Sequence, residues 1–403
     1  MNTKKTIAVM FGGMSAEHDV SILTGLQIID SFDSTKYDVF PLYIAQDGNW
    51  FTGKALLNRK NYPLDNSTIA LLDKVQLRLG NGFENKKTSR FSFVSTKNPL
   101  FGCPKIYEFD AVMPAFHGTL GEDGSIQGMF ELAGIPYAGF RVLGAAVYMD
   151  KAFSKKVFSE QGLPYLKTII VNRPKNEGFI DFKALLKNYD IKYPVCCKPC
   201  NLGSSVGVSK ASNEEELIAG LAAVFKLDNT ALVEPFVTNL VEYNVSVTSV
   251  FGETTTSAIE KPMKKEAFLD FKDKYLSSTE IASKLDIPSE GMAGAIRDLN
   301  PQELSKDEEK LIRDCAVKAF DAVGGKGVVR VDFLCDGDTR EIYINEVNTF
   351  PGSLSCYLWE AASPKVIFSD ILDKMMIEAF ALSKEQTKIV DPSLANSSVF
   401  KKK

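Results

Sequence analysis

Two neighbouring β-runs in this sequence carry polar side chains whose types and spacing could hold a metal ion. The runs are VVRVDFL and REIYINEVN within Val328–Ser353, and an Asp-Gly-Asp turn joins them. Side chains two apart on a strand share a face, so Arg330 lies beside Asp332. For the same reason Glu346 lies beside Asn348. One antiparallel register sets Asp332 opposite Glu346, and that register also pairs the other two residues.

The expected hairpin offers two carboxylates, an amide oxygen and a guanidinium on one patch. Oxygen ligands with little sulfur or imidazole are what Mg²⁺ prefers, usually with substrate phosphates completing its shell. From this stretch alone, a surface hairpin with salt bridges is an equally good interpretation. The neighbouring side chains that can face a core are Val329, Val331, Phe333, Ile344 and Val347.

A loop of small residues, CNLGSSVG at positions 200–207, lies between two predicted strands. Glycine and serine allow backbone N–H groups to approach phosphate oxygens closely. Lys198, at the end of the preceding predicted strand, can neutralise phosphate charge, although a plain tight turn is the alternative. Lys151 begins a predicted helix, and Glu234 and Glu242 flank a strand-to-strand connection. Taken singly, these three residues would be surface charges.

The surrounding elements predict an α/β protein. Strands at Thr6–Phe11 and Tyr37–Ile44 flank a helix from about Ala16 to Phe32, which is the opening of a doubly wound domain. The intervening glycines fit neither G-x-G-x-x-G nor the Walker pattern, so no dinucleotide or P-loop site is predicted there. Residues 46–106 are expected to form short strands inserted on the surface. Further expected elements are strands at Asp110–Phe116, Pro136–Ala138, Lys167–Val171, Tyr193–Lys198, Ala231–Val237 and Tyr243–Phe251, and helices at Ser125–Ala133, 306–323 and, broken near Met149, 141–162.

Capping and turn signals place the remaining boundaries. Ser212 with Glu215 and Ser305 with Glu308 have the spacing of capping boxes. The stretch 262–304, with its charges and glycines, is expected to be a mobile loop, and the tail is expected to fray. The expected domains are 1–139, 140–229 and 230–385, followed by a tail at 386–403.

The composition limits the function classes. The chain has 403 residues, 45% of them hydrophobic, and a formal charge of −4, so it gives no general attraction to nucleic acid or anionic membrane. No apolar run reaches about 18 residues, so no transmembrane helix is predicted. Seven cysteines without framework spacing indicate a reducing cytoplasm, and Cys197 and Cys200 are interpreted as core residues. The only histidines, His18 and His117, argue against a zinc site and a Ser-His-Asp triad.

Six motifs occur together in a fixed order, and together they resemble the D-alanine–D-alanine ligases of the ATP-grasp superfamily over roughly residues 5–385. The motifs are FGGMSAEHDVS, HGTLGEDGSIQG, the MDK of Met149–Lys151, KPCNLGSSVGVSKA, FLDFKDKY and RVDF…INEVNTFPG. The resemblance implies an α/β (α+β) fold of three domains, with the nucleotide between the central and C-terminal ones. It also implies a reaction in which ATP phosphorylates the carboxylate of one D-alanine and the amine of a second attacks the acyl phosphate, making peptidoglycan precursor.

The resemblance assigns nucleotide and metal contacts by position. The implied ATP set is Lys151 and Lys198 at the phosphates, Lys274 at the transferred phosphate, Glu234 near adenine, Val237 as a backbone contact and Glu242 at the ribose. One extra residue separates Glu234 from Glu242 relative to the family. The implied ligands of two Mg²⁺ or Mn²⁺ ions are Asp332, Glu346 and Asn348, which are residues that the hairpin register groups independently.

The resemblance also assigns amino-acid contacts. Glu17 matches the acid that holds the ammonium of the first D-alanine, and its place near a helix N-terminus also suits capping. Ser204 and Tyr275 match partners that link Glu17 to the loop over the site. His117 matches a histidine near the first substrate, and Arg330 matches the guanidinium at the oxyanion of the tetrahedral intermediate. The position of Tyr275 favours D-alanine over D-lactate as acceptor.

The acceptor side departs from the family pattern. After Pro351-Gly352 the chain reaches Leu-Trp-Glu about four residues early, and the family's carboxylate-binding serine has no clear match. We therefore expect Gly352 together with Ser353, Ser355 or Arg297 to bind the acceptor carboxylate. One alternative is an ATP-grasp ligase with a different acceptor. Another is a non-catalytic nucleotide-binding protein, which the intact set of charged residues argues against. The family suggests a homodimer.

Overall fold

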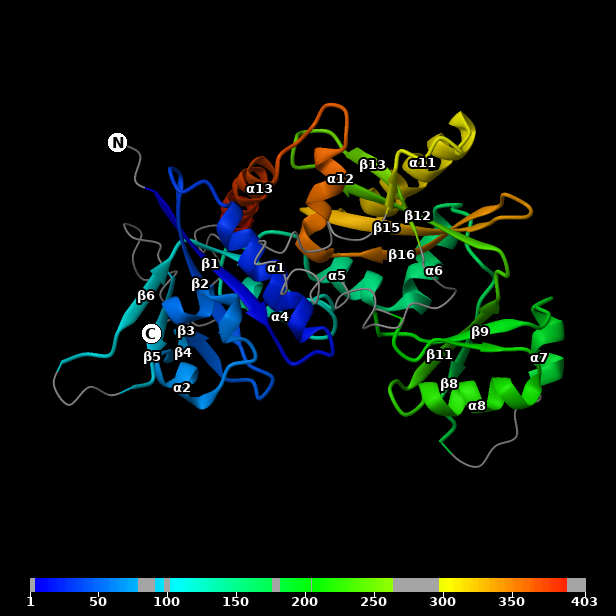
Figure 1. Cartoon of the computed structure of the whole chain (residues 1–403), viewed down its shortest axis with the longest axis horizontal. Helices are drawn as coiled ribbons and strands as arrows, with labels where there is room; N and C mark the ends of the chain where they lie inside the picture. The colour runs from blue at the N-terminus through cyan, green and yellow to red at the C-terminus, as the bar shows by residue number, and fades with distance from the viewer. Residues whose placement is uncertain are drawn as a thin grey trace, which may run out of the picture.

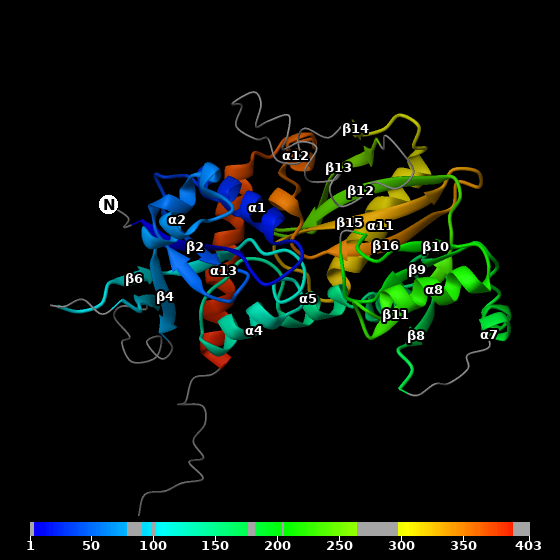
Figure 2. The same cartoon turned by 60° about the horizontal axis from the view of Figure 1, so that its bottom comes forward.

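The computed structural model describes residues 4–78, 91–97, 102–175, 182–203, 205–263 and 297–389. Strands in these ranges form three sheets with helices packed on them (Figure 1). A seven-stranded sheet lies on the N-terminal side, and a four-stranded and a five-stranded sheet lie together at the other end (Figure 2). No helix among the described residues combines the length and apolar character needed to cross a membrane.

The seven-stranded sheet has the doubly wound start that the sequence predicts. β1 (Lys5–Gly12) pairs in parallel with β2 (Tyr37–Ile44) and β7 (Ala111–Pro114), and α1 (His18–Ser31) connects the first two strands. The short strands predicted within 46–106 are confirmed, but the prediction that they are a surface insertion is wrong, because they continue this sheet edge to edge from β2. The added elements are β3 (Trp50–Thr52), β4 (Asp73–Arg78), β5 (Phe91–Ser95), β6 (Ile106–Phe109), the short helix α2 (Asn66–Ala70) and the 3₁₀ turns η1 (Lys54–Leu57) and η2 (Arg59–Asn61).

The segment after β7 leads to the second sheet through helices. α4 (Ser125–Leu132) is followed by an isolated bridge at Tyr137, where the sequence predicts a short strand at Pro136–Ala138. α5 (Val142–Met149) and α6 (Lys151–Glu160) confirm the predicted break near Met149.

The four-stranded sheet is antiparallel. Its strand order is β10 (Ser209–Ala211), β9 (Val195–Pro199), β11 (Thr230–Pro235) and β8 (Ile169–Asn172), with α7 (Phe182–Asn188) and α8 (Glu214–Val224) packed on it. The predicted Ser212–Glu215 capping box is wrong by one residue. Asn213 is the N-cap of α8, and its side chain accepts a hydrogen bond from the N–H of Glu216.

The five-stranded sheet has the order β14 (Arg297–Leu299), β13 (Thr255–Pro262), β12 (Leu240–Thr248), β15 (Val328–Asp336) and β16 (Ile342–Asn348). α11 (Lys306–Ala322) covers one face, and the predicted capping box of Ser305 and Glu308 is confirmed. The last residue of β13 and all of β14 fall within the stretch 262–304 that was expected to be a loop, so that prediction is wrong at residues 262 and 297–299. Residues 264–296 lie outside the described residues.

The predicted hairpin is confirmed, with one irregularity. Arg330 pairs with Asn348, and Asp332 pairs with Glu346, as expected. The register then shifts, so that Phe333 pairs with Ile344 and one residue of β16 is extra. The apolar side chains expected to face the core are buried beneath α11; they are Val329, Val331, Phe333, Ile344 and Val347.

The C-terminal part of the described chain returns to the first sheet. After β16 come the 3₁₀ turn η4 (Gly352–Ser355), α12 (Cys356–Glu360) and α13 (Phe368–Ile389). α13 buries Ile371 and Met375 in the same core as Ile7 and Val9 of β1. The N-terminal sheet is therefore completed by a helix more than 350 residues away in the sequence.

Candidate active site

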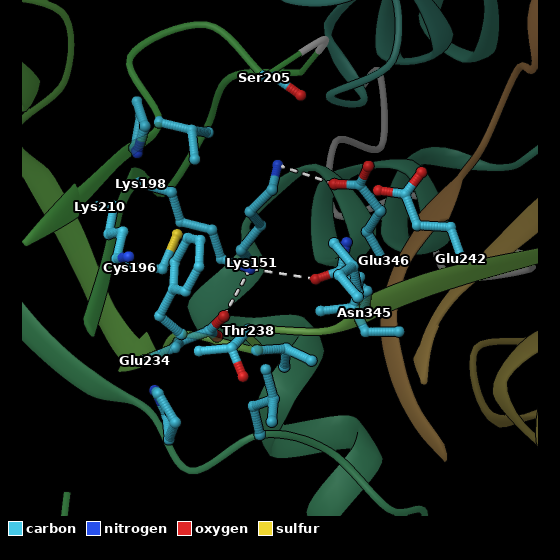
Figure 3. A pocket seen from close by; sticks show the side chains of 18 of the residues that line it. Lys151, Cys196, Lys198, Ser205, Lys210, Glu234, Thr238, Glu242, Asn345 and Glu346 are labelled. Carbon is cyan, nitrogen blue, oxygen red and sulfur yellow. Dashed lines mark hydrogen bonds and ion pairs between the residues drawn. The ribbon is translucent and has the colours of Figure 1, made fainter. Parts of the chain in front are cut away.

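A pocket of about 560 Å³ lies between the four-stranded and five-stranded sheets (Figure 3). This volume suits a small-molecule or cofactor site. The predicted nucleotide residues among its lining are Lys151, Lys198, Glu234, Val237 and Glu242, together with Glu346 of the predicted metal set. The sixth predicted nucleotide residue, Lys274, lies outside the described residues.

Glu234, on β11, is a buried carboxylate held by cations on two sides. Lys155 Nζ lies 3.0 Å from Oε1, and Lys198 Nζ lies 2.7 Å from Oε2. The hydroxyl of Thr168 donates to Oε1 at 2.8 Å. Burial raises the pKa of Glu234, but the two lysines outweigh this effect and hold the pKa at about 2. Burial lowers the pKa of Lys155 despite its contact with Glu234.

Sequence reasoning missed Lys155, because burial of a lysine depends on the tertiary structure. A signal was nevertheless present. Lys155 follows Lys151 by four residues, so both ammonium groups leave the same face of α6. The helix starts where Asp150 caps it, accepting a hydrogen bond from the N–H of Phe153 at 2.9 Å.

The two predicted phosphate lysines reach β16 from different elements. Lys151 Nζ lies 3.3 Å from Glu346 Oε2 and donates to the carbonyl oxygen of Leu202 at 2.7 Å. Lys198 Nζ donates to Asn345 Oδ1 at 3.1 Å (Figure 3). Asn345 is the extra residue at the register shift, so the bulge turns its side chain toward the pocket beside Glu346.

The predicted metal ligands lie together on the open face of the hairpin. Arg330 binds Asp332 through two contacts, Nε to Oδ1 at 2.6 Å and Nη2 to Oδ2 at 2.7 Å. Asn348 Nδ2 donates to Asp332 Oδ2 at 3.0 Å. Two carboxylates and an amide oxygen on adjacent strands suit Mg²⁺ or Mn²⁺. Within the described ranges no cluster of three His, Cys, Asp or Glu side chains is placed to hold a metal, so such an ion would also need amide and phosphate oxygens.

Glu17 lies where α1, the loop after β7 and the small-residue loop meet. A Cβ built on Gly118 would lie 2.6 Å from Glu17 Oε2, and one built on Gly203 would lie 3.1 Å from it. The carboxylate therefore needs glycine at these contacts. The side chain does not cap α1, contrary to the capping role that its position suggested. Ser204 and Tyr275, its predicted partners, lie outside the described residues.

His117 is buried beside this acid site. Its Nε2 lies 2.8 Å from Thr24 Oγ1, and its ring meets that of Phe350 edge-on at 6.2 Å between centroids. Burial lowers the pKa of His117 to about 4, although a hydrogen bond with the backbone of Phe350 opposes this effect. The imidazole is therefore neutral at pH 7.

Glu122, which sequence reasoning assigned no role, connects two predicted parts of the site. Its carboxylate accepts hydrogen bonds from the N–H of Gly118 at 2.8 Å and of Phe350 at 2.9 Å. Burial and the nearby Glu17 raise the pKa of Glu122 to about 8. The loop after β7 is thereby tied to the segment that follows Asn348.

The predicted acceptor residues lie in and near η4. Ser353, Leu354 and Ser355 all have positive φ, between 49° and 51°, which non-glycine residues adopt mainly where the surroundings force them. The hydroxyl of Ser353 donates to Gln27 Oε1. Ser355 is fully buried, and its hydroxyl has no hydrogen-bond partner among the described residues. Arg297 lies at the sheet edge on β14, 3.4 Å from Glu260.

A pocket between two antiparallel sheets, lined by Lys198 and Glu234 from one sheet and by Glu242 and Glu346 from the other, is the arrangement of the ATP-grasp class. Comparison with known proteins agrees. Residues 6–140 match the family model described as D-ala D-ala ligase N-terminus, and residues 157–377 match that for the C-terminus. The chain belongs to the D-alanine–D-alanine ligase family.

Individual relatives match along nearly the whole chain. The D-alanine–D-alanine ligase of Acetivibrio thermocellus is 34% identical, covering 93% of this chain and 96% of its own. The solved D-alanine–D-alanine ligase of Coxiella burnetii superposes with a TM-score of 0.77 at 25% identity, covering 98% and 99% of the two chains. The VanG D-Ala:D-Ser ligase of Enterococcus faecalis gives 0.71 at 27% identity, covering 94% and 100%.

Proposed function

We propose that this protein joins two D-alanines into D-alanyl-D-alanine with ATP, through an acyl phosphate, for peptidoglycan precursor synthesis. The observation that carries the proposal is the 3.3 Å contact between Lys151 and Glu346. It joins a pocket of nucleotide size to the hairpin that bears the expected metal ligands. A triphosphate in this pocket would therefore end beside Asp332, Glu346 and Asn348.

In the proposed mechanism the chain's own residues screen and orient the reactants. Lys151 and Lys198, with Lys274, neutralise the phosphates, and Glu234, Val237 and Glu242 contact the adenosine. Two Mg²⁺ or Mn²⁺ ions, held by Asp332, Glu346 and Asn348, would neutralise charge on the transferred phosphoryl group. Arg330, which lies against Asp332, then stabilises the oxyanion of the tetrahedral intermediate.

The first D-alanine is proposed to bind between Glu17 and His117. The Glu17 carboxylate takes the ammonium group, while neutral His117 contributes hydrogen bonding rather than charge. Ser204 and Tyr275 are proposed to link Glu17 to the loop over the site. Gly352 and Ser355 face the acceptor, whereas the engagement of Ser353 with Gln27 makes it the weaker of the two serine candidates.

The organisation of the whole protein is also a proposal. Domains at 1–139, 140–229 and 230–385, with a tail at 386–403, would bring the first substrate, ATP and the metal ions together from three sides. We further propose a homodimer in the cytoplasm.

The test is a product screen with purified protein, ATP, Mg²⁺ and a panel of D- and L-amino acids. Release of phosphate only with ATP and D-alanine together, and a dipeptide mass in the product, would support the proposal. Lys198→Met and Asp332→Asn should each lower the rate of product formation by more than about 100-fold. No phosphate release with any amino acid would overturn the proposal in favour of a non-catalytic nucleotide-binding protein.

A ligase with a different acceptor is the second candidate. It is favoured by η4, whose three left-handed residues lead directly into α12. The structural relative titled VanG D-Ala:D-Ser ligase is an example of a different acceptor. Competition between D-alanine and D-serine as acceptor, read as the ratio of the two dipeptides by mass spectrometry, decides between the candidates.

A further inference from the structure

Arg297 and Glu260 form a buried ion pair on the edge of the five-stranded sheet. β14 pairs with β13 so that Arg297 lies opposite Pro262, two residues from Glu260. Arg297 Nη1 lies 3.4 Å from Glu260 Oε2, and the two side chains are only 10% and 7% exposed. Burying such a pair carries a desolvation cost, so its presence at a sheet edge calls for an explanation.

Strand register places this ion pair on the same face as the predicted metal ligands. Glu260 pairs with Asn244 on β12, Asn244 pairs with Asp332 on β15, and Asp332 pairs with Glu346 on β16. The amide of Asn244 lies between the two neighbouring carboxylates, 3.4 Å from Glu260 and 3.2 Å from Asp332. One polar row therefore runs from the edge of the sheet to the hairpin.

Tyr357 of α12 holds the guanidinium from the other side. The central carbon of Arg297 lies 3.9 Å from the centroid of the Tyr357 ring. Burial and the nearby Glu260 carboxylate raise the pKa of Tyr357, and the charges of Arg330 and Arg297 act against this rise. The ring therefore contacts the guanidinium of Arg297 directly and also feels the charge of Arg330, the predicted oxyanion residue.

The hydroxyl of Ser355 is buried at the end of η4, two residues before Tyr357, and has no hydrogen-bond partner among the described residues. Buried polar groups are nearly always paired, so this orphaned hydroxyl indicates a polar ligand. The buried hydroxyl of Tyr357 interacts with the carboxylate of Glu260. A carboxylate ligand would accept from the Ser355 hydroxyl and from a guanidinium.

We infer that Arg297, supported by Glu260 and Tyr357, binds the carboxylate of the acceptor amino acid. This inference rests on the proposed function and replaces the serine contact that the shortened segment after Gly352 lacks. The chemistry of an α-amino acid agrees with this placement. Its amine attacks the acyl carbon, whose oxyanion Arg330 is proposed to stabilise. Because a single carbon separates the amine from the carboxylate, the carboxylate must bind close to Arg330. Glu260 is a positioning residue that acts through Arg297.

An assay with hydroxylamine in place of the acceptor measures the formation of the acyl phosphate independently of acceptor binding. Hydroxylamine is a nucleophile that can trap the acyl phosphate of D-alanine as a hydroxamate, and it has no carboxylate to be recognised. With Arg297→Met, the KM for acceptor D-alanine should rise about 10- to 100-fold, because a charge-assisted contact is lost. Hydroxamate formation and the KM for ATP should stay within about twofold of the native protein. Arg297→Lys keeps the positive charge but loses the planar, bidentate donors of the guanidinium. It replaces Arg297→Met in these assays if the methionine variant does not fold.

Two further measurements distinguish recognition from structure. D-Alaninamide has the amine but not the carboxylate, so the preference for D-alanine over D-alaninamide should collapse in Arg297→Met and weaken in Glu260→Gln. Tyr357→Phe should keep most of the preference and Tyr357→Leu should lose it. Arg340→Met is the control, because it breaks another arginine–glutamate pair, with Glu308, outside the proposed acceptor site. It should change neither the KM for acceptor D-alanine nor the preference for D-alanine over D-alaninamide.

Two outcomes would overturn the inference: an unchanged preference in Arg297→Met, or an equal fall in hydroxamate and dipeptide formation. A native protein that forms no hydroxamate from ATP and D-alanine would instead refute the proposed function. The two failures are therefore distinguishable in the same experiment.

Discussion

Buried charge is the feature that organises this site at the scale of single residues. Glu234 takes a lysine on each side, which holds its carboxylate ionised, and Asp332 takes an arginine, which fixes the direction of its carboxylate. Such pairs contribute little net stability, but removing one partner leaves an uncompensated charge. They therefore act chiefly to position the groups that face the pocket.

Lys155→Met should leave Glu234 with only one cation. We expect the KM for ATP to rise about tenfold and the free energy of unfolding to fall by about 3 kcal/mol, as for other broken buried pairs. Steady-state kinetics and urea titration measure the two effects. Lys156→Met, on the neighbouring position of α6, is the matched control. A Lys155 variant with native ATP affinity would show that Glu234 needs no second cation.

The pKa of His117 predicts a pH effect on stability. Its pKa of about 4 in the folded protein lies below the ordinary value of 6.5. The unfolded chain therefore binds the proton first, and stability falls as the pH decreases from about 6.5 to 4, by up to about 3 kcal/mol. NMR titration should find the ring neutral at pH 5.5. His117→Gln should flatten this part of the urea stability curve, and a ring that titrates near 6.5 would contradict the prediction.

At the scale of elements, the hairpin of β15 and β16 positions the predicted metal ligands because polar and apolar side chains alternate along both strands. The same alternation made it predictable: polar residues two apart must share a face, and only one register pairs them. The bulge at Asn345 was not predictable in this way, since a single extra residue leaves the pattern on either side intact. Charged residues that tertiary packing buries, such as Lys155 and Glu260, were also missed.

The edge strand β14 and the N-cap of α8 also could not be predicted from the sequence. β14 has three residues, RDL, and no apolar period that distinguishes it from a loop. At α8, Ser212 and Asn213 are both good caps, and only the backbone geometry selects the second. The roles predicted for the site residues, including Ser204, Lys274 and Tyr275, remain predictions.

Asp332→Asn should lower the affinity of the proposed site for Mg²⁺ without changing the pairing of β15 with β16. The amide keeps the shape of the side chain but loses the charge that an ion and Arg330 both need. We expect kcat to fall by more than about 100-fold and the Mg²⁺ requirement to rise. Activity measured across Mg²⁺ concentrations tests this, and Asp336→Asn at the far end of β15 is the control. An unchanged Mg²⁺ dependence would remove Asp332 from the ligand set.

Ser305→Ala tests an element rather than the site. The Ser305 hydroxyl accepts from the N–H of Glu308, and the carboxylate of Glu308 accepts from the N–H of Ser305 at 2.8 Å. Loss of this cap should lower the free energy of unfolding by about 1 kcal/mol and leave kcat unchanged. Thermal unfolding and a standard assay measure both. A large loss of activity would show that α11 controls the sheet face that bears the site.

At the scale of the whole molecule, the pocket lies between two sheets, so a ligand there should bind the folded chain only. ATP at about 100 times its dissociation constant should add about 2.7 kcal/mol, which raises the melting temperature by several degrees. Lys198→Met should abolish most of this rise in a calorimetric scan. A rise that persists in the variant would place the nucleotide elsewhere.

The return of α13 to the first sheet has a consequence for how the protein is made. Ile7 and Val9 share their core with Ile371 and Met375, so β1 cannot be fully covered until α13 has been synthesised. A nascent polypeptide would expose that apolar surface of β1 until α13 has left the ribosome. Chaperone capture during this interval would protect the uncovered strand from aggregation.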